Sequence, residues 1–359
     1  LRCILLNPGP VSLSDAVRKA AVSTDLCHRE PEYFELQDEV RSGLLDVYGC
    51  SPSSWASVLL GGSGTTALEA MLTSLLPRDA CLLVIENGVY GERISRIARI
   101  HGIEHEAIEH PWTDAIDFEQ VAEALSNGLF THVAAVHHET TTGRLNDVQT
   151  LAKMCEHHGV QLLLDAVSSF GAEHIPFDSP ALAAVAGTAN KCLHGIPGLC
   201  FVIGRRSALQ NSAEPPRSLS MHLPLWLEKQ DQQGTPFTPS VNAVLALREA
   251  LRELERHGGW EGRRARYRDL AGQVRNGLAA MSVEPLLGEN ESSCVLNAYR
   301  LPEGFTYDRV HDGLKQWGFV IYAGQGSLVA EMFRISTMGD ITRYDLERLL
   351  AAIETVFKR

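Results

Sequence analysis

Apolar and polar residues alternate along most of this chain in two distinct periods. From about residue 56, short apolar runs take turns with longer stretches in which apolar residues recur every three or four positions. The apolar runs predict buried strands and the longer stretches predict amphipathic helices. The predicted strands are 56–60, 81–86, 103–108, 131–138, 160–166, 183–188 and 199–204, and the predicted helices are 64–76, 91–102, 117–128 and 147–159. This alternation indicates an α/β fold with a mostly parallel seven-stranded sheet and helices on both faces.

The pattern changes after residue 204. Residues 207–224 contain several prolines and serines with little periodicity, which predicts an irregular crossing segment. Residues 241–259 predict a long helix that ends in a glycine pair and leads into a second unit. The elements predicted beyond it are helices 263–281, 307–318 and 343–357 and strands 294–301, 319–324 and 332–338. We therefore expect a large domain of residues 16–258 and a smaller α+β domain of residues 1–15 and 259–359, with the boundary near Gly258.

Composition and charge narrow the possible partners. Hydrophobic residues make up 45% and charged residues 21% of the 359 residues, which is ordinary for a globular enzyme with a large core. The net charge of −12 opposes binding to nucleic acid or to anionic membranes. The longest apolar runs are far too short to span a bilayer and no secretory leader is visible, so we expect a cytoplasmic protein. The eight cysteines lack paired spacing, which favours reduced thiols.

Asp165 and Lys191 carry the most informative chemistry in the chain. A lysine amine forms a Schiff base with the aldehyde of pyridoxal 5'-phosphate, and a carboxylate keeps the pyridine nitrogen of that cofactor protonated. Lysines usually lie on the surface, and Asp165 could simply cap a turn. However, small apolar residues precede Lys191 and a GIPG turn follows it, so we expect a buried amine whose pKa is lowered by desolvation.

Three further segments follow predicted strands and could surround a cofactor. Residues 61–66 (GGSGTT) open a predicted helix, where backbone N–H groups and the Ser63 and Thr65 hydroxyls could hold a phosphate or merely cap the helix. Tyr90 could stack on a flat ring or belong to the core. Thr140, in the run HETTTG, could reach the cofactor or the substrate, or lie in a polar turn.

Arg334 lies inside a predicted apolar strand. An unpaired cation there would be costly, so Arg334 is expected to meet an anion, either a protein carboxylate or the carboxylate or phosphonate of a substrate. The histidine pairs at 137–138 and 157–158 lack a matching carboxylate pattern, so we predict no metal site.

Nine stretches spanning nearly the whole chain resemble the class V, fold type I aminotransferases, which depend on pyridoxal phosphate. They are NPGP (7–10), HREPEYF (28–34), GSGTTALEAM (62–71), ENGVYGERI (86–94), HETTTG (138–143), LLLDAVSSFG (162–171), TANKCLHGIPG (188–198), RSLSMHL (217–223) and FRIS (333–336). The combination is similar to the branch of the family that moves the amino group of 2-aminoethylphosphonate to pyruvate, giving phosphonoacetaldehyde and alanine. The resemblance therefore implies an amino donor, a keto-acid acceptor and pyridoxal phosphate.

The same resemblance implies a role for each candidate residue. Lys191 and Asp165 would be catalytic, with Lys191 forming the Schiff base and Asp165 facing the pyridine nitrogen. The other residues implied to contact the cofactor are Ser63, Gly64, Thr65, Tyr90, Thr140, Asn190 and, from the neighbouring subunit, Thr238. Arg334 and Gly9 would contact the substrate. Sharing of Thr238 between subunits implies a homodimer.

Some alternatives stay open. Relatives tend to carry a lysine where this chain has Gln325, which leaves the exact amino donor undecided. A class V aminotransferase of the alanine:glyoxylate or serine:pyruvate type, or one that acts on another aminophosphonate, fits most of the same residues. A cysteine desulfurase would need a cysteine on a mobile loop, whereas Cys294 precedes a predicted strand. A cofactor-binding regulator without catalytic activity is the alternative from a different class.

Overall fold

A seven-stranded sheet forms the centre of the larger lobe. The computed structural model describes residues 2–210 and 215–358. The strands run in the order β2-β10-β9-β8-β5-β3-β4. Their bounds are β2 Trp55–Gly62, β3 Cys81–Glu86, β4 Glu104–Glu109, β5 His132–Val136, β8 Gln161–Asp165, β9 Leu182–Thr188 and β10 Gly198–Arg205. Only β10 runs antiparallel to its neighbours, so the sheet is mostly parallel and the predicted α/β class is confirmed.

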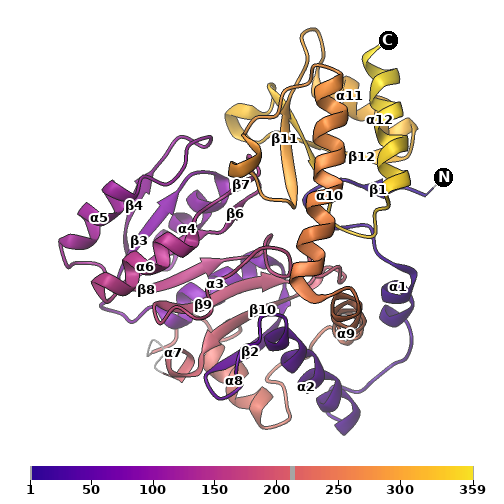
Figure 1. Ribbon diagram of the computed structural model, residues 1–359. Coiled ribbons are helices and arrows are strands. Elements are labelled where there is room, and N and C mark those ends of the chain that lie inside the picture. Colours follow the sequence, from indigo (N-terminus) through magenta and orange to yellow (C-terminus); the bar gives the residue numbers. More distant parts are fainter. Residues whose placement is uncertain (1, 211–214, 359) are drawn as a thin grey trace.

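Helices cover both faces of this sheet (Figure 1). One face packs against α1 Asp15–Ala21, α2 Pro31–Asp46, α5 Phe118–Ser126, α6 Val148–His158 and α9 Val241–Arg256. The other packs against α3 Gly64–Leu75, α4 Val89–Ile100, α7 Arg206–Gln210 and α8 Leu223–Asp231. Successive residues of β3 alternate between the two cores, with Leu83 and Ile85 in one and Leu82 and Val84 in the other. Both faces of the inner strands are therefore apolar, which explains why these strands read as continuous apolar runs, whereas the edge strand β4 is mostly polar and exposed.

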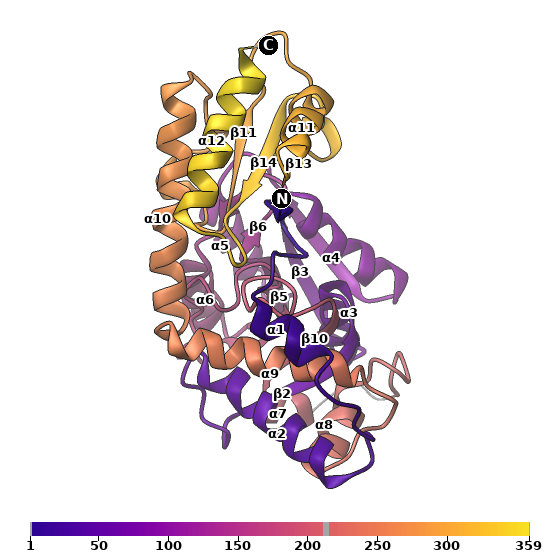
Figure 2. The ribbon, with the colours of Figure 1, turned by 90° about the vertical axis from the view of Figure 1, so that its right-hand side faces the viewer.

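The smaller lobe combines both ends of the chain (Figures 1 and 2). Its elements are β1 Ile4–Leu5, α10 Gly259–Ala280, β11 Leu296–Arg300, α11 Tyr307–Gln316, β12 Phe319–Val320, β13 Tyr322–Ala323, β14 Met332–Ser336 and α12 Arg343–Phe357. Strands β11, β14 and β13 form an antiparallel sheet, while β1 pairs with β12 in parallel. The N-terminal strand is therefore part of the lobe formed by the C-terminal residues.

Three details differ from the sequence-based expectations. Residues 319–324 are not one strand, because the chain changes partners at Ile321: β12 pairs with β1 and β13 with β14. Within 207–224, the structure has the end of α7 and the start of α8, so that segment is only partly irregular; residues 211–214 lie outside the described residues. Strand β1, helices α1, α2, α7 and α8, and the hairpin of β6 His138–Glu139 and β7 Arg144–Leu145 were not predicted. In the described residues no helix has the length and apolarity that crossing a bilayer requires.

Candidate active site

The candidate residues come together where the parallel strands end. Asp165 is the last residue of β8, and it is in register with Val136 at the end of β5 and Ala186 in β9. Lys191 follows β9 by three residues. Because the carboxyl ends of parallel strands share one edge of a sheet, this edge is where ligands of α/β proteins bind. The sheet thus brings Asp165 and the Lys191 turn together.

The amine of Lys191 lies against the N-terminal segment, and the side chain is partly buried. Its Nζ atom donates a hydrogen bond to the carbonyl oxygen of Pro8. Gly9 adopts a φ of +106°, and a Cβ atom at this position would lie 2.7 Å from Lys191 Cδ. Burial of the ammonium lowers the pKa of Lys191 to about 8, although the nearby Asp165 carboxylate acts in the opposite direction. An uncharged, nucleophilic amine is thus accessible near neutral pH, and only glycine fits at position 9.

Asp165 is a buried carboxylate with few protein partners. Its Oδ1 atom accepts a 2.9 Å hydrogen bond from the Val167 amide. Burial raises the pKa of Asp165 to about 6, while the Val167 amide and the charges of Arg93 and Lys191 lower it. The carboxylate is consequently ionised at neutral pH. It can stabilise a positive charge placed against it.

The N-terminus of α3 fits a phosphate group. Ser63 is the N-cap residue, yet its hydroxyl makes no capping hydrogen bond; instead its amide donates to Thr66 Oγ1 at 3.2 Å. A Cβ atom on Gly64 would lie 2.4 Å from Val167 Cγ1, so this turn packs directly on the loop that follows Asp165. Thr65 Oγ1 accepts a 3.2 Å hydrogen bond from Arg93 Nη1. A hydroxyl without a capping bond, the first amides of a helix and a guanidinium group are suitable ligands for a phosphate.

Two residues of this site, Arg93 and Glu139, were missed by the sequence analysis. The guanidinium carbon of Arg93 lies 4.5 Å from the centroid of the Tyr90 ring. Arg93 is three residues after Tyr90 on α4, so helical spacing from Tyr90 could have identified it. Glu139 lies far from α4 in sequence, and no local pattern pairs it with that helix.

The Glu139 carboxylate is fully buried and joins α4 to the β6–β7 hairpin. Oε2 accepts hydrogen bonds from the amides of Tyr90 at 3.1 Å and Gly91 at 3.4 Å. Oε1 accepts hydrogen bonds from the amide of Thr141 at 3.0 Å and from its hydroxyl at 2.6 Å. Burial raises the pKa of Glu139 to about 7 despite these donors. The carboxylate therefore fixes the turn that carries Tyr90 relative to Thr140, the next residue of the hairpin.

Arg334 reaches from the smaller lobe into the larger one. Its side chain is fully buried, and Nη1 donates to the carbonyl oxygen of Thr140 at 2.6 Å and to Gln325 Oε1 at 3.3 Å. Nε donates to the carbonyl oxygen of Ala323 at 2.8 Å. Nη2 is buried and has no hydrogen-bond partner, and no carboxylate in residues 2–210 or 215–358 forms an ion pair with Arg334. An unsatisfied guanidinium nitrogen indicates room for an anionic ligand.

The structure shows few side-chain contacts for three other predicted residues, Asn190, Thr140 and Thr238. Asn190 precedes the lysine, and its Oδ1 accepts a 2.8 Å hydrogen bond from the Thr188 hydroxyl. Thr140 is buried and contacts Arg334 through its carbonyl group. Thr238 lies exposed in the loop between α8 and α9. The roles implied for these three side chains stay predictions.

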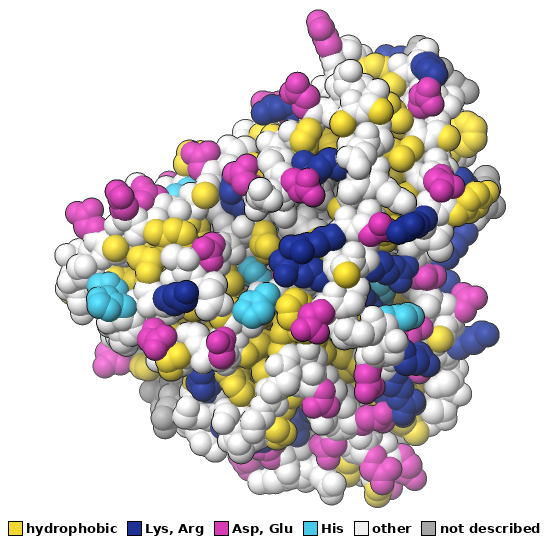
Figure 3. Space-filling model, in the orientation of Figure 1, with side chains coloured by type: hydrophobic (Ala, Val, Ile, Leu, Met, Phe, Trp, Pro, Cys, Tyr) yellow, Lys and Arg dark blue, Asp and Glu magenta, His cyan; other side chains and the backbone are white. Residues whose placement is uncertain are grey.

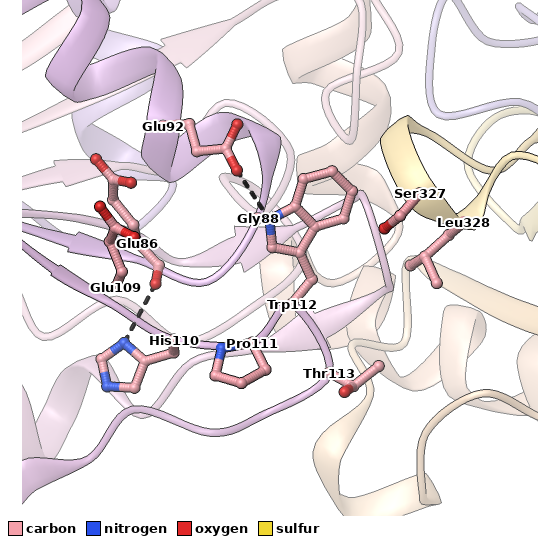
Figure 4. Close-up of a pocket in the computed structure, with 10 residues that line it drawn as sticks. All are labelled: Glu86, Gly88, Glu92, Glu109, His110, Pro111, Trp112, Thr113, Ser327 and Leu328. Carbon is pink, nitrogen blue, oxygen red and sulfur yellow. Dashed lines mark hydrogen bonds between the residues drawn. The ribbon is translucent and has the colours of Figure 1, made fainter.

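A cavity of about 430 Å³ lies between the start of α4, the ends of β3 and β4 with the segment that follows β4, and residues 327–328 of the smaller lobe (Figure 4). Its lining residues are Glu86, Gly88, Glu92, Glu109, His110, Pro111, Trp112, Thr113, Ser327 and Leu328. Trp112 Nε1 donates a 2.9 Å hydrogen bond to Glu92. A Cβ atom on Gly326 would lie 2.3 Å from Trp112 Cη2, so the loop after Gln325 packs on this indole ring. None of the predicted cofactor or substrate residues lines the cavity, so it is distinct from the set of candidate residues.

Comparison with known proteins adds independent information. The sequence model of the family described as "Aminotransferase class-V" matches residues 18–349. A 2-aminoethylphosphonate–pyruvate transaminase from Phocaeicola vulgatus is 36% identical over 360 residues, covering 99% of each chain. A protein of the same name from Syntrophobacter fumaroxidans is 39% identical, covering 99% of this chain and 96% of its own. The crystal structure of an aspartate aminotransferase of subgroup IV from Thermus thermophilus superposes with a TM-score of 0.89 at 28% identity, covering 99% of both chains.

Proposed function

Since this chain belongs to the class V aminotransferase family, we propose that it transfers the amino group of 2-aminoethylphosphonate to pyruvate, with pyridoxal phosphate as cofactor. The products would be phosphonoacetaldehyde and alanine. The observation that carries this proposal is the convergence of Lys191, Asp165 and the unsatisfied Arg334 in a chain whose relatives of that name match it over almost its full length.

The residues present fit the cofactor. When bound, pyridoxal phosphate supplies an aldehyde that condenses with amines and a ring that withdraws electrons from the carbon bearing the amino group. The α3 N-terminus, with the uncommitted Ser63 hydroxyl and the amides of Gly64 and Thr65, would hold the phosphate. Tyr90 would face the ring, and Asp165 would keep the ring nitrogen protonated.

Lys191 would move the proton. Its lowered pKa of about 8 allows the amine to lose its proton near neutral pH, as a general base requires. The Pro8 carbonyl holds the amine in place, and Gly9 leaves room for the methylene chain. Lys191 would take a proton from the carbon that bears the donor's amino group and deliver it to the aldehyde-derived carbon of the cofactor. It would move the proton in the opposite direction when pyruvate accepts the amino group.

Arg334 would bind the acidic group of each substrate. Its Nε and Nη1 atoms are held by the carbonyl groups of Ala323 and Thr140, which leaves Nη2 for a phosphonate or a carboxylate oxygen. Gln325 places a neutral amide beside the guanidinium group. A single cation therefore serves both the phosphonate of the donor and the carboxylate of pyruvate. We also infer a homodimer in which the exposed Thr238 reaches the phosphate of the neighbouring subunit.

Absorption spectroscopy tests the proposal. The purified protein, incubated with pyridoxal phosphate and freed of excess, should show a band near the visible edge that decreases when 2-aminoethylphosphonate is added and returns when pyruvate is added. The Lys191→Ala protein should lack this response. Absence of the band, or a band unchanged by any amine, would disprove a transaminase function. A response to alanine and serine but not to the phosphonate would leave an aminotransferase with a different donor.

A further inference from the structure

A pocket at the junction of the two lobes lies outside the site described above. It has a volume of about 420 Å³ and takes its walls from α10, from residues 289–297 and from Leu145 and Glu173 of the larger lobe. Figure 3 shows Lys and Arg side chains gathered on this face, beside the lower half of α10. No residue assigned above to the cofactor or to the amino donor lines this pocket, which we call the junction pocket.

One face of α10 supplies three guanidinium groups to the junction pocket. Arg264, Arg268 and Arg275 all line it. They are four and seven positions apart, so at 3.6 residues per turn they lie on the same side of the helix. Ala271 and Gly272 lie between them, and a Cβ atom on Gly272 would meet no atom within 4 Å. The arginines therefore surround an open hollow.

The buried carboxylate of the pocket is already bound. Glu173 Oε1 accepts hydrogen bonds from the Ser293 hydroxyl at 2.7 Å and the Cys294 amide at 3.0 Å. Its Oε2 atom lies 3.0 Å from Arg264 Nε, so these two charges are paired. The other lining carboxylate, Glu289, is exposed to solvent. The charge of Arg264 is thus largely compensated by the protein.

The charges of Arg268 and Arg275 are not compensated in this way. Arg275 donates to three uncharged oxygens, which belong to Leu287 at 3.3 Å, Ser292 at 3.3 Å and Asn297 at 2.5 Å. Arg268 is exposed, and neither arginine forms an ion pair with a carboxylate in the part of the chain that the structure describes. Two guanidinium groups without a carboxylate partner therefore line one hollow, although the protein as a whole carries a net charge of −12.

We propose that the junction pocket binds a compact dianion of the phosphate or phosphonate type through Arg268 and Arg275. Planar guanidinium groups match the oxygen geometry of such anions and bind them more strongly than they bind a monocarboxylate. Ser292 and Asn290 line the same hollow and add polar groups for the remaining oxygens. Inorganic phosphate and an organic phosphonate share this chemistry. The proposal is independent of the proposed transaminase function, because it rests on different residues.

Thermal unfolding in the presence of anions tests the proposal. The protein, loaded with pyridoxal phosphate, is titrated with phosphate, methylphosphonate or acetate at one ionic strength. A ligand that binds only the folded state raises the melting temperature with its concentration. We expect phosphate and methylphosphonate to stabilise the protein and acetate not to. Whichever dianion raises the melting temperature at the lower concentration shows whether the natural ligand resembles inorganic phosphate or an organic phosphonate. Equal stabilisation by acetate would overturn the proposal.

Three variants locate the binding. Arg268→Gln should weaken dianion binding, measured by calorimetry, about tenfold, because a charge-assisted contact is lost. Arg300→Gln makes the same charge change at an exposed position outside the pocket and should leave the affinity unchanged. If Arg268→Gln melts early without ligand, Arg268→Lys serves instead and should lose affinity because its amine lacks the planar fork. Binding that is unaffected at position 268 but lost in Arg334→Gln would place the anion in the candidate active site and refute the proposal.

Discussion

Nη1 of Arg334 donates a 2.6 Å hydrogen bond to the carbonyl oxygen of Thr140, and this contact joins the two lobes across the candidate site. It orients the guanidinium group through main-chain atoms that no side-chain substitution removes. The free Nη2 atom is consequently directed by the backbone of the larger lobe as well as by β14.

Two substitutions of Arg334 should separate the contribution of its positive charge to catalysis from that of its planar guanidinium geometry. Arg334→Gln removes the cation and should lower kcat/KM for 2-aminoethylphosphonate about 100-fold, because the substrate anion loses a buried charge-assisted partner. Arg334→Lys keeps the charge but cannot make both carbonyl contacts, so an intermediate loss is expected. Steady-state kinetics with donor and pyruvate varied separately measures both effects. Wild-type kcat/KM in Arg334→Lys would show that the fork geometry is unimportant.

Asp165 should set the pH at which Lys191 becomes reactive. The uncharged fraction of the amine rises as pH rises through its pKa of about 8, so capture of pyridoxal phosphate by the apoprotein should accelerate over that range. The Asp165 carboxylate raises this pKa, so Asp165→Asn should move the midpoint to lower pH. Stopped-flow absorption follows the capture. Asp178→Asn removes an exposed carboxylate and is the control; an unmoved midpoint in Asp165→Asn would mean that the two charges do not interact.

Glu139 should make stability depend on pH. Its folded-state pKa of about 7 lies above the usual value of 4.5, so the folded state binds more protons between these values and stability falls as pH rises through them. The full effect is up to about 3 kcal/mol. Glu139→Gln should flatten this dependence. It should also destabilise the protein by about 1–3 kcal/mol, because in either orientation the amide N–H₂ would face N–H donors, those of Tyr90 and Gly91 or that of Thr141. Urea unfolding from pH 5 to pH 8 measures both, with the exposed Glu156→Gln as the control. A wild-type slope retained in Glu139→Gln would assign the pH dependence to another group.

The packing of Gly64 on Val167 should be detectable by a double-mutant cycle. Gly64→Ala would place a methyl group 2.4 Å from Val167 Cγ1 and should weaken cofactor binding and lower stability by about 1–3 kcal/mol. Val167→Ala removes the obstructing atoms. The double variant should therefore recover most of the loss, measured as cofactor affinity and as free energy of unfolding. Additive losses would indicate that the two residues do not contact each other.

The sequence predicts the sheet better than the contacts within the site. Apolar runs identify the strands of the large sheet that are buried on both faces. The exception is the edge strand β4, whose residues are mostly polar and exposed and whose place follows from the alternation with helices. Helix α2 was not predicted although its buried Tyr33, Leu36, Val40 and Leu44 recur at three- and four-residue spacing. That pattern is present in the sequence, but the helix also carries many polar residues on its exposed side.

Within the site, the sequence identifies candidate residues that lie at the end of a predicted strand, but it does not identify contacts between residues that are far apart in the chain. Asp165 lies at the end of one strand that the sequence predicts and Lys191 follows another, which places both at the same edge. By contrast, Glu139 contacts the amide of Tyr90 from 49 residues away, and Arg334 contacts Thr140 from 194 residues away. Neither partner can be recognised from one sequence, because the first contact depends on folding within the larger lobe and the second on packing of the two lobes.

Residues 4–9 link the smaller lobe to the amine of Lys191. Strand β1 belongs to the sheet of β12, and only a few residues later Pro8 and Gly9 lie against Lys191. Any rotation of the smaller lobe would therefore change the immediate surroundings of the lysine through a short, covalently continuous path. Substitutions in β1 should therefore act on turnover through the positions of Pro8 and Gly9, although the strand itself belongs to the smaller lobe.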